Sequence, residues 1–542
     1  MRFRLTKTAK ILLAVIVVAL VGGGIFFGLK SGFITNDTKD VAHNIKESVT
    51  GNDDGHKVDS QAAEEYAAGD SDAVITMDKE TSDTINLSLD EWIGWKPIMD
   101  ANGGTTTKEG SIYDKLGIKV NISVINDATQ SSNALIKGDL DAAGYTINRT
   151  AFLSTKFKDA GIDVIMPYIT NYSNGGDGII ATSSIKSVND MVGAKIGVPQ
   201  FSEAHTLVVW FVNNSDLSDS DKKSIIDNLI FFETPDEAAK AFFAGEVDVA
   251  ATWEPYITQA ESMSDAHALF TTKASTGLVM DGILFNKAFA ESNPEIVNKF
   301  IQGSLQAAGV YETEMETIKS VMPMFSTATD EEIVDNCGGA KLATWKDNSD
   351  LLNGNAKTIY TDMCDVWASI GESSEKDIVD AIFDDTYIKN LEGQFSSDET
   401  SMTETVKVTE DNEDEIIDAE AMLSKSVTVN FIKSTAKFSD TKEAKAALDE
   451  FIKIANILDG AIIQVEGNTD PNPNSDPEDK YNKKLSKSRA DAVKKYLVMN
   501  GIDADRIVTV GNGSSKPVVK NDTEEHRAMN RRTDISFKMI EQ

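Results

Sequence analysis

The chain has 542 residues, of which 52 are basic and 87 acidic, so its formal net charge is −35 at pH 7. A chain of this length is too long for one hydrophobic core, and several domains are expected. The negative charge argues against a nucleic-acid-binding protein, because such proteins present basic surfaces to the phosphate backbone. It fits an exported protein that faces water.

The N-terminus carries an apolar run from Ile11 to Leu29, which as a helix just spans a hydrocarbon core of ~30 Å. Basic residues precede the run, so the start of the chain is expected in the cytoplasm and the rest outside it. These are Arg2, Arg4, Lys7 and Lys10. A cleaved signal peptide is the alternative, but no clear small-x-small cleavage site follows the run. We therefore expect residues 1–30 to form a cytoplasmic start and a single-pass transmembrane anchor.

The next segment, residues 31–84, is rich in Asp, Asn, Ser, Gly and Lys and shows little apolar periodicity. This composition is typical of a disordered tether, because it offers too little apolar surface to bury. A flexible chain of that length spans roughly 40 Å root-mean-square. The tether is expected to lead from the membrane to a folded unit that comprises residues 85–392.

A short pattern occurs twice within that unit. Gly138–Ala143 reads GDLDAA, Gly245–Ala251 reads GEVDVAA, and each follows an amphipathic helical stretch. In each copy a glycine ends the helix and a short apolar strand begins. The strands run on into polar or aromatic tips that contain Thr146 in the first copy and Trp253 and Glu254 in the second. Because ligands of open α/β sheets bind outside the carboxyl ends of strands, both tips are expected to face one cleft. A coincidental repeat is the alternative.

These blocks and four further segments resemble the solute-binding proteins of ABC importers, in the NMT1-like group of nitrate, sulfonate and taurine binders. The further segments are Asp177–Ala181, Ile185–Val198, Thr252–Tyr256 and Asp281–Asn286. The resemblance covers Ile85 to Leu391 and implies two α/β lobes joined by two crossovers, near residues 178–181 and 280–284. The expected bounds are 85–180 and 280–392 for lobe 1 and 182–278 for lobe 2.

One expected wall of the cleft follows the strand Leu87–Leu89, whose tip contains Trp92, Trp95 and Lys96. A tryptophan at a cleft edge offers a flat, dehydrating wall, and Lys96 would attract an anion. The alternative for the two tryptophans is packing against their own lobe.

A second wall is expected where Ser202 opens an apolar helix that includes Glu203 and Thr206. Ser202 suits an N-cap, and free amides at a helix start bind anionic oxygens. Capping without a ligand is the alternative, and Glu203 could itself satisfy the helix dipole. A small anion such as a sulfonate is therefore the leading expectation, while Glu203, Glu254 and Asp177 favour an amine-bearing solute instead. The expected solute-binding residues are Trp92, Trp95, Lys96, Thr146, Asp177, Ser202, Thr206, Trp253 and Glu254.

Residues 393–425 are acidic and are expected to form a linker, with a charged helix as the alternative for its end. Residues 426–542 follow a βαβαββ pattern. Val427–Ile432 alternates apolar and polar residues like a half-buried strand. Asn482–Asn500 is expected to form the second helix, which Gly501 ends.

Three short blocks stand in a fixed order in this last region. They are Gly467–Asp470, then Asn482 with Leu485–Ala490, then Asn530–Arg532. Asp470 follows an apolar run and can bind an ammonium group, while Arg489 can grip a carboxylate with its two-pronged donor fork. The pair therefore suits a zwitterion.

The order and spacing of these blocks resemble the OmpA-like peptidoglycan-binding domain, which is also found in flagellar stator proteins. The resemblance covers Ser426 to Lys538 and places the C-terminus outside the cytoplasm, at the cell wall. It implies that Asp470, Asn482 and Arg489 bind the diamino acid of the peptidoglycan stem peptide. A domain that keeps the fold but has lost the ligand is the alternative. Arg531 and Arg532 are expected to pair with nearby carboxylates.

The sequence gives little support for an enzymatic function. The five histidines form no HxxxH or HxH cluster, no cysteine pair has zinc spacing, and no Gly-rich phosphate loop occurs. Ser202 and His205 are expected to cap a helix and line a polar surface. We expect no catalytic residue, metal or cofactor. Cys337 and Cys364 are expected either to form a disulfide or to be two buried thiols.

The whole pattern predicts a membrane-anchored extracytoplasmic solute-binding protein. It would capture a small anionic molecule, present it to an ABC permease, and be held at the cell wall by peptidoglycan. The runner-up is a wall-to-membrane linker or solute sensor with no transport role. A neighbouring permease and ATPase gene pair would favour the first. A third class, an extracytoplasmic enzyme, would need a catalytic constellation.

Overall fold

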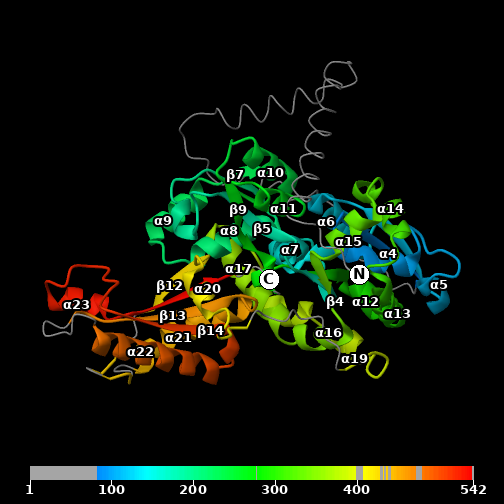
Figure 1. The fold of residues 1–542 in the computed structure, drawn as a ribbon. Coiled ribbons are helices and arrows are strands. Elements are labelled where there is room, and N and C mark those ends of the chain that lie inside the picture. Colours follow the sequence, from blue (N-terminus) through cyan, green and yellow to red (C-terminus); the bar gives the residue numbers. More distant parts are fainter. Residues whose placement is uncertain are drawn as a thin grey trace, which may run out of the picture.

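The computed structural model describes residues 82–275, 277–397, 407–427, 431–432, 435–437, 441–471 and 479–539. The expected anchor, Ile11–Leu29, and all but the last three residues of the expected tether lie outside these residues. In the part of the chain that is described, no helix combines the length and the apolar character needed to cross a membrane. The described strands form three sheets, which belong to two lobes and a C-terminal domain, coloured yellow to red in Figure 1.

Lobe 1 is built on a mixed sheet in the order β11-β4-β10-β3-β1-β2. Its strands are β1 (Thr84–Leu89), β2 (Lys119–Val124), β3 (Ala142–Thr146), β4 (Val164–Ser173), β10 (Met280–Asn286) and β11 (Ala340–Leu342). Strand β1 runs parallel to β2 and β3, and β10 runs antiparallel to β3 and β4. Every residue of β4 and β10 is buried, as expected of central strands covered on both faces.

The helices of lobe 1 come from both ends of its sequence. They are α4 (Lys96–Asn102), α5 (Ile112–Leu116), α6 (Ala128–Lys137), α7 (Ile147–Asp159), α12 (Lys287–Ser292), α13 (Pro294–Ala307), α14 (Glu316–Val321), α15 (Asp330–Cys337), α16 (Trp345–Leu351), α17 (Asn355–Ser369), α18 (Val379–Ile382) and α19 (Thr386–Lys389). Cys337 and Cys364 are separate buried thiols in these helices. Of the two alternatives left open by the sequence, the structure therefore has the buried thiols.

Lobe 2 is built on a second sheet in the order β7-β6-β8-β5-β9. Its strands are β5 (Asp177–Thr182), β6 (Ile196–Pro199), β7 (Ile230–Phe232), β8 (Val249–Trp253) and β9 (Ala266–Thr271). Its helices are α8 (Glu203–Asn214), α9 (Asp219–Asp227), α10 (Pro235–Phe243) and α11 (Tyr256–Glu261). The two-lobed α/β architecture expected from the sequence is thus confirmed.

The chain crosses between the lobes twice. The first crossover, residues 174–176, joins β4 to β5, and the second, residues 272–279, joins β9 to β10. Both lie slightly before the places that the sequence suggested, because residues 178–181 and 280–284 are already paired within β5 and β10.

The sequence repeat has the structure predicted for it. Helix α6 is followed by Gly138 in the left-handed conformation, with φ of 76°, and then by β3. Helix α10 is followed by Gly245, with φ of 73°, and then by β8. One copy belongs to each sheet, so the two strand tips come from different lobes.

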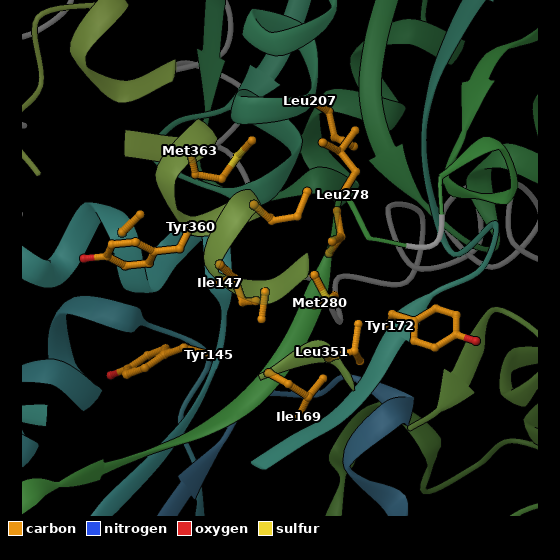
Figure 2. Close-up of a cluster of buried hydrophobic side chains, with 14 of the residues drawn as sticks. Tyr145, Ile147, Ile169, Tyr172, Leu207, Leu278, Met280, Leu351, Tyr360 and Met363 are labelled. Carbon is orange, nitrogen blue, oxygen red and sulfur yellow. The ribbon is translucent and has the colours of Figure 1, made fainter. Parts of the chain in front are cut away.

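The hydrophobic core continues across the junction between the lobes. Figure 2 shows buried side chains from lobe 1, from lobe 2 and from the second crossover in one cluster. Among them are Ile147 of α7, Met363 of α17, Leu207 of α8, and Leu278 and Met280. The lobes therefore pack against each other in this structure.

The C-terminal domain has the expected βαβαββ order, with added helices. Its elements are α20 (Glu413–Asp418), β12 (Leu423–Val427), α21 (Thr441–Ile457), β13 (Ile462–Asn468), α22 (Lys480–Met499), β14 (Ile507–Gly513), α23 (Glu524–Asn530) and β15 (Thr533–Lys538). Strand order is β12-β15-β13-β14, with β13 parallel to β14. The first strand starts at Leu423, before the Val427–Ile432 run expected for it, and α20 buries Ile416 within the stretch expected to be a linker.

Candidate functional site

Four carboxylates gather where the two lobes and both crossovers meet. Asp90 directly follows β1, and Asp177 is the first residue of β5. Asp281 is the second residue of β10, and Glu203 is the first residue of α8. Asp177, Glu203 and Asp281 are buried, while Asp90 is partly exposed. We call these four residues the acidic cluster.

The carboxylates of the acidic cluster act on one another. Burial, and then the charges of Glu203 and Asp90, raise the pKa of Asp177 to about 7. Burial and the charges of Asp90, Asp177 and Glu203 raise the pKa of Asp281 well above its usual value. Burial also raises the pKa of Asp90, although the charge of Arg149 opposes this shift. The site is therefore short of positive charge.

Arg149, in the first turn of α7, connects the acidic cluster across the lobes. Its Nη2 lies 3.0 Å from Glu203 Oε2, so lobe 1 forms an ion pair with lobe 2. The neighbouring Asn148 donates a hydrogen bond from Nδ2 to Thr206 Oγ1 of lobe 2, at 2.8 Å. Phe152 stacks on Phe201, with ring centroids 4.8 Å apart. The two lobes are therefore closed on each other.

Trp92 and Trp95 adjoin the acidic cluster. Trp95 Nε1 donates a hydrogen bond to Asp90 Oδ1 at 2.6 Å. Trp92 Nε1 donates to Asn171 Oδ1 at 2.9 Å, and a hydrogen bond from Trp92 also bears on the pKa of Asp281. Trp95 is buried and Trp92 is partly buried, so both indole rings pack within the structure while their N–H groups reach the polar side chains.

Lys96 lies elsewhere than the sequence suggested. Its side chain is fully buried, and its Nζ lies 2.6 Å from Asp100 Oδ2 and 5.9 Å from the ring centroid of Tyr311. Burial raises the pKa of Asp100 to about 6 against the opposing effect of Lys96. The ammonium group that was expected to attract an anion is instead held in a buried ion pair within lobe 1.

Ser202 acts as a helix cap. Its hydroxyl accepts a hydrogen bond from the backbone N–H of His205 at 3.2 Å and donates one to the carbonyl of Pro199 at 2.6 Å. Burial lowers the pKa of His205 to about 3, so this ring is neutral at ordinary pH. Glu203, with its partner Arg149, occupies the first turn of the same helix, where an anion was expected.

Thr146 and Thr206 also serve local structure. Thr146 caps α7 by accepting a hydrogen bond from the N–H of Arg149, and it lies opposite Asp281 in the β3–β10 register. Thr206 donates to the carbonyl of Glu203 at 2.7 Å and accepts the interlobe hydrogen bond from Asn148. Both threonines therefore border the acidic cluster and fix the two residues that form the interlobe ion pair.

The tip of strand β8 lies beside the acidic cluster because its backbone pairs with that of β5. Trp253 lies opposite Asp177 in the β5–β8 register, and its Nε1 donates a hydrogen bond to Asp236 Oδ1 at 3.0 Å. Glu254 accepts hydrogen bonds from the N–H and the hydroxyl of Thr258, so it caps the turn into α11. In this structure Glu254 therefore holds the start of α11 in place.

Sequence reasoning missed Asp90, Arg149 and Asp281 as members of the site. Asp90 follows the apolar run of β1 directly, so the strand-end rule that selected Trp92 could also have found it. Asp281 stands in a segment quoted for the family resemblance but was not singled out. Arg149 carries no local signal, because only the approach of α7 to α8 gives it a partner.

The residues expected to bind the wall depend on a close approach of helix α22 to strand β13. A Cβ atom built on Gly467 would lie 2.0 Å from the carbonyl oxygen of Ser486, so only glycine allows the backbones to come this near. The approach brings Arg489 of α22 beside Asp470, just past the end of β13, and the charge of Asp470 acts on the pKa of Arg489.

Arg489 is 4% exposed, and its guanidinium carbon lies 4.9 Å from the ring centroid of Phe431. Among the described residues, its one hydrogen bond runs from Nε to the carbonyl of Thr435 at 3.2 Å. Burial and the charge of Arg531 lower its pKa. A guanidinium group carries a planar pair of donors that matches the geometry of a carboxylate.

Asp470 forms an ion pair with Arg531 at 3.3 Å, and Arg531 also binds Glu524 at 2.7 Å. Arg532 pairs with Asp534 at 2.8 Å, so the expectation that both arginines pair with carboxylates is confirmed. Asn482 is buried and donates a hydrogen bond to Asp479 at the start of α22. Asp470 and Arg489 are thus brought together, with Arg531 as a third charge that the sequence assigned to structure alone.

No group of three or more His, Cys, Asp or Glu residues in the described part of the chain is arranged to hold a metal ion.

Two family profiles match the chain. The family described as NMT1/THI5 like matches residues 106–312, and the OmpA family matches residues 430–531. The outer membrane protein A of Bordetella avium is 40% identical over 119 residues, which make up 22% of this chain and 57% of that protein. The peptidoglycan-associated lipoprotein of Haemophilus influenzae is 39% identical over 101 residues, 19% of this chain and 63% of that protein. The chain thus spans less than two thirds of either relative.

Solved structures also resemble the two-lobed unit. The periplasmic aliphatic sulphonate binding protein from Escherichia coli is 15% identical with a TM-score of 0.44, covering 57% of this chain and 99% of that one. The periplasmic nitrate-binding protein from Synechocystis is 13% identical with a TM-score of 0.43, covering 57% of this chain and 87% of that one.

Proposed function

We propose that this chain, a fusion of an NMT1/THI5-like domain with an OmpA-family domain, is an extracytoplasmic solute-binding protein that its C-terminal domain holds at the cell wall. The two family matches support this reading, because one covers most of the two-lobed unit and the other most of the C-terminal domain. The solute would bind between the lobes and be handed to an ABC permease. The apolar run Ile11–Leu29 would anchor the chain in the membrane.

We further infer that the solute carries a positive charge. The observation that supports this is the acidic cluster, which draws carboxylates from both lobes, two of them in the strands that directly follow the crossovers. Ionised carboxylates are costly to bury without a counter-charge, and Arg149 offsets only part of this charge. The indole rings of Trp92 and Trp95 adjoin the cluster, and aromatic faces attract organic cations. Of the two solute classes that the sequence left open, the geometry favours the amine over the anion.

This proposal can be tested by thermal shift. The melting temperature of the full chain is measured at pH 8 with each member of a panel of solutes. A ligand that binds only the folded state at 100 times its Kd stabilises the protein by about 2.7 kcal/mol. Primary amines, guanidinium compounds and quaternary ammonium compounds are the expected hits, and sulfonates, nitrate and divalent metal ions are expected to leave the melting temperature unchanged.

A matched pair of variants locates the effect. Asp281→Asn removes an ionisable carboxyl group from the acidic cluster and should abolish the shift given by the best cation. Asp139→Asn makes the same change at an exposed position of lobe 1 and should leave the shift intact. A sulfonate that raises the melting temperature of the wild type while amines do not would overturn the cationic assignment.

We propose that the C-terminal domain binds the diamino acid of the peptidoglycan stem peptide. Asp470 would accept its ammonium group, and Arg489 would bind its carboxylate. The proximity of the two side chains supports this assignment, as does the OmpA-family match. The alternative function is a wall-to-membrane linker or a solute sensor with no transport role. A neighbouring permease and ATPase gene pair would favour transport over that alternative.

A further inference from the structure

The C-terminal domain packs directly on the second crossover. After α21 ends, the backbone N–H of Gly460 donates a hydrogen bond to the carbonyl of Ala274 at 3.1 Å. Ser275 Oγ donates one to the carbonyl of Ile457 at 2.6 Å. Ala274 and Ser275 are 1% and 0% exposed. Two backbone segments from different domains therefore form a buried contact at the hinge.

The contact depends on a glycine. A Cβ atom built on Gly460 would lie 2.2 Å from the carbonyl oxygen of Lys273 and 3.2 Å from the Cα of Ala274. The φ of Gly460 is outside the left-handed region, so its own backbone would accept another residue. The glycine is needed only because the two domains approach each other here.

The crossover that receives this contact is tied to the acidic cluster. Thr272 is fully buried, and its hydroxyl donates to the carbonyl of Asp177 at 3.2 Å. The same hydroxyl accepts a hydrogen bond from the N–H of Gly175 at 2.8 Å, within the first crossover. A single side chain, two residues before Ala274, thus connects both crossovers to the residue that carries one of the cluster's carboxylates.

Other contacts of the C-terminal domain reach both lobes. Lys186 of lobe 2 pairs with Glu420 at 2.5 Å, and Thr271 of β9 donates a hydrogen bond to Met539 Sδ at 3.3 Å. On the lobe 1 side, the charge of Lys453 acts on Asp362 of α17. The domain therefore spans the hinge between the two lobes.

We propose that the C-terminal domain is a clamp on this hinge, so that docking of the domain stabilises closure of the lobes and closure stabilises docking. Opening the lobes requires the crossover backbones to change their dihedral angles. A surface that is complementary to one backbone conformation of residues 273–275 binds that conformation best. Docking of the domain therefore shifts the population toward that conformation. The structure has the lobes in contact while the domain is docked. By reciprocity, a solute that closes the lobes must also tighten docking.

The hinge contact lies away from the residues proposed to bind the wall. Gly460 precedes β13, whereas Asp470 follows it, so the two contacts lie at opposite ends of this strand. Strand β13 has 7 residues, and at about 3.3 Å per residue it separates the two ends by roughly 20 Å. The domain can therefore hold peptidoglycan at one end and the hinge at the other.

Hydrogen exchange on the full chain, without any solute, tests the clamp. Gly460→Ala should release the domain, and the interlobe segments 148–152 and 201–206 should then exchange about fivefold faster or more, the usual size of a coupling between sites. Gly309→Ala is the matched control, because a Cβ atom there meets nothing within 4 Å and its φ also lies outside the left-handed region. It should leave exchange in both segments unchanged.

Faster exchange confined to residues 272–279 and 457–461 would overturn the proposal, because docking would then be uncoupled from closure. Lys186→Glu provides a second variant, since it places two carboxylates opposite each other at the exposed edge of the interface. It should accelerate exchange in the same interlobe segments, and no change there would also count against the clamp. Neither measurement uses a solute, so this outcome is independent of the cationic assignment.

Discussion

Arg149 of lobe 1 and Glu203 of lobe 2 form an ion pair across the interlobe junction, at 3.0 Å, with both side chains largely buried. Each of the two residues is positioned by the start of a helix. Arg149 lies in the first turn of α7, which Thr146 caps, and Glu203 lies in the first turn of α8, which Ser202 caps. The pair therefore reports whether the lobes are closed.

The Arg149→Met variant should destabilise the closed protein. It leaves Glu203 and Asp90 without their opposing charge, and removing one member of a largely buried pair costs several kcal/mol, here about 3 kcal/mol. Chemical denaturation of the full chain measures the loss. Lys158→Met, in the same helix, breaks the exposed pair with Glu375 and should change stability little. Equal effects of the two variants would contradict the role given to Arg149.

Stability without solute should depend on pH through Asp177. Its pKa is about 7 in the folded chain and near 3.8 when exposed, so the folded state binds the proton more tightly. The resulting stabilisation is complete below pH 3.8 and is lost as the pH rises through 7. Melting temperatures should therefore fall between pH 6 and pH 8. The Asp177→Asn variant should show a weaker dependence, and an unchanged pH profile would contradict this assignment.

The affinity for a cationic solute should show the opposite trend. A cation binds the ionised carboxylate, so at pH below about 7 binding must first release the proton from Asp177. Each released proton lowers the affinity by up to about tenfold per pH unit. Isothermal titration at pH 5.5, 6.5 and 7.5 should show this decline. In two buffers of different ionisation enthalpy, the titrations should also show that binding releases protons.

Trp92 should contribute more to cation binding than Trp253. Trp92 adjoins Asp281, whereas the indole of Trp253 is bound to Asp236 on α10. Trp92→Ala should lower the affinity about fivefold or more, because it removes an aromatic face worth about 1 kcal/mol or more to a desolvated cation. Trp253→Ala should lower it less, since it disturbs the strand tip without removing that face. The reverse order would show that the second strand tip forms the principal wall.

A separate prediction concerns the proposed wall site. It is tested by sedimenting the full chain with purified peptidoglycan at fixed salt. Arg489→Ala should abolish most of the sedimentation, because an unpaired ligand carboxylate costs at least about 2 kcal/mol, or roughly thirtyfold in affinity. Asp470→Asn tests charge apart from shape. Arg532→Ala is the control, since Arg532 pairs with Asp534. Equal sedimentation of wild type and Arg489→Ala would exclude the proposed contact.

Much of the fold could be predicted because its signals are local. The two helix–glycine–strand repeats identified one strand in each sheet, and the blocks around Asp470 and Arg489 identified a domain whose strand order follows the expected pattern. The strand Leu423–Val427 was missed because it lies at an acidic boundary, where pairing with β15 decides its structure.

The interlobe site could be predicted only in part, because it depends on distant segments meeting. Lys96 stands on a promising strand tip, but Asp100 four residues later in the same helix holds it in the core. That spacing is a helical ion-pair signal, which could have removed Lys96 from the candidates. Arg149 and Asp281 become site residues only through the meeting of α7, α8 and β10, which no single stretch of sequence records.

Strand β13 also has a mechanical consequence, because it connects the hinge contact to the proposed wall site along its length. Its neighbours β14 and β15 pair with it over most of that length. A pull between the wall and the lobes would load these hydrogen bonds in shear, where many must break together, while only a few hydrogen bonds and one ion pair between the domain and the lobes hold the hinge contact. Under the proposed function, tension in the envelope would therefore release the hinge before it unfolded the domain, and it would weaken the binding of the solute.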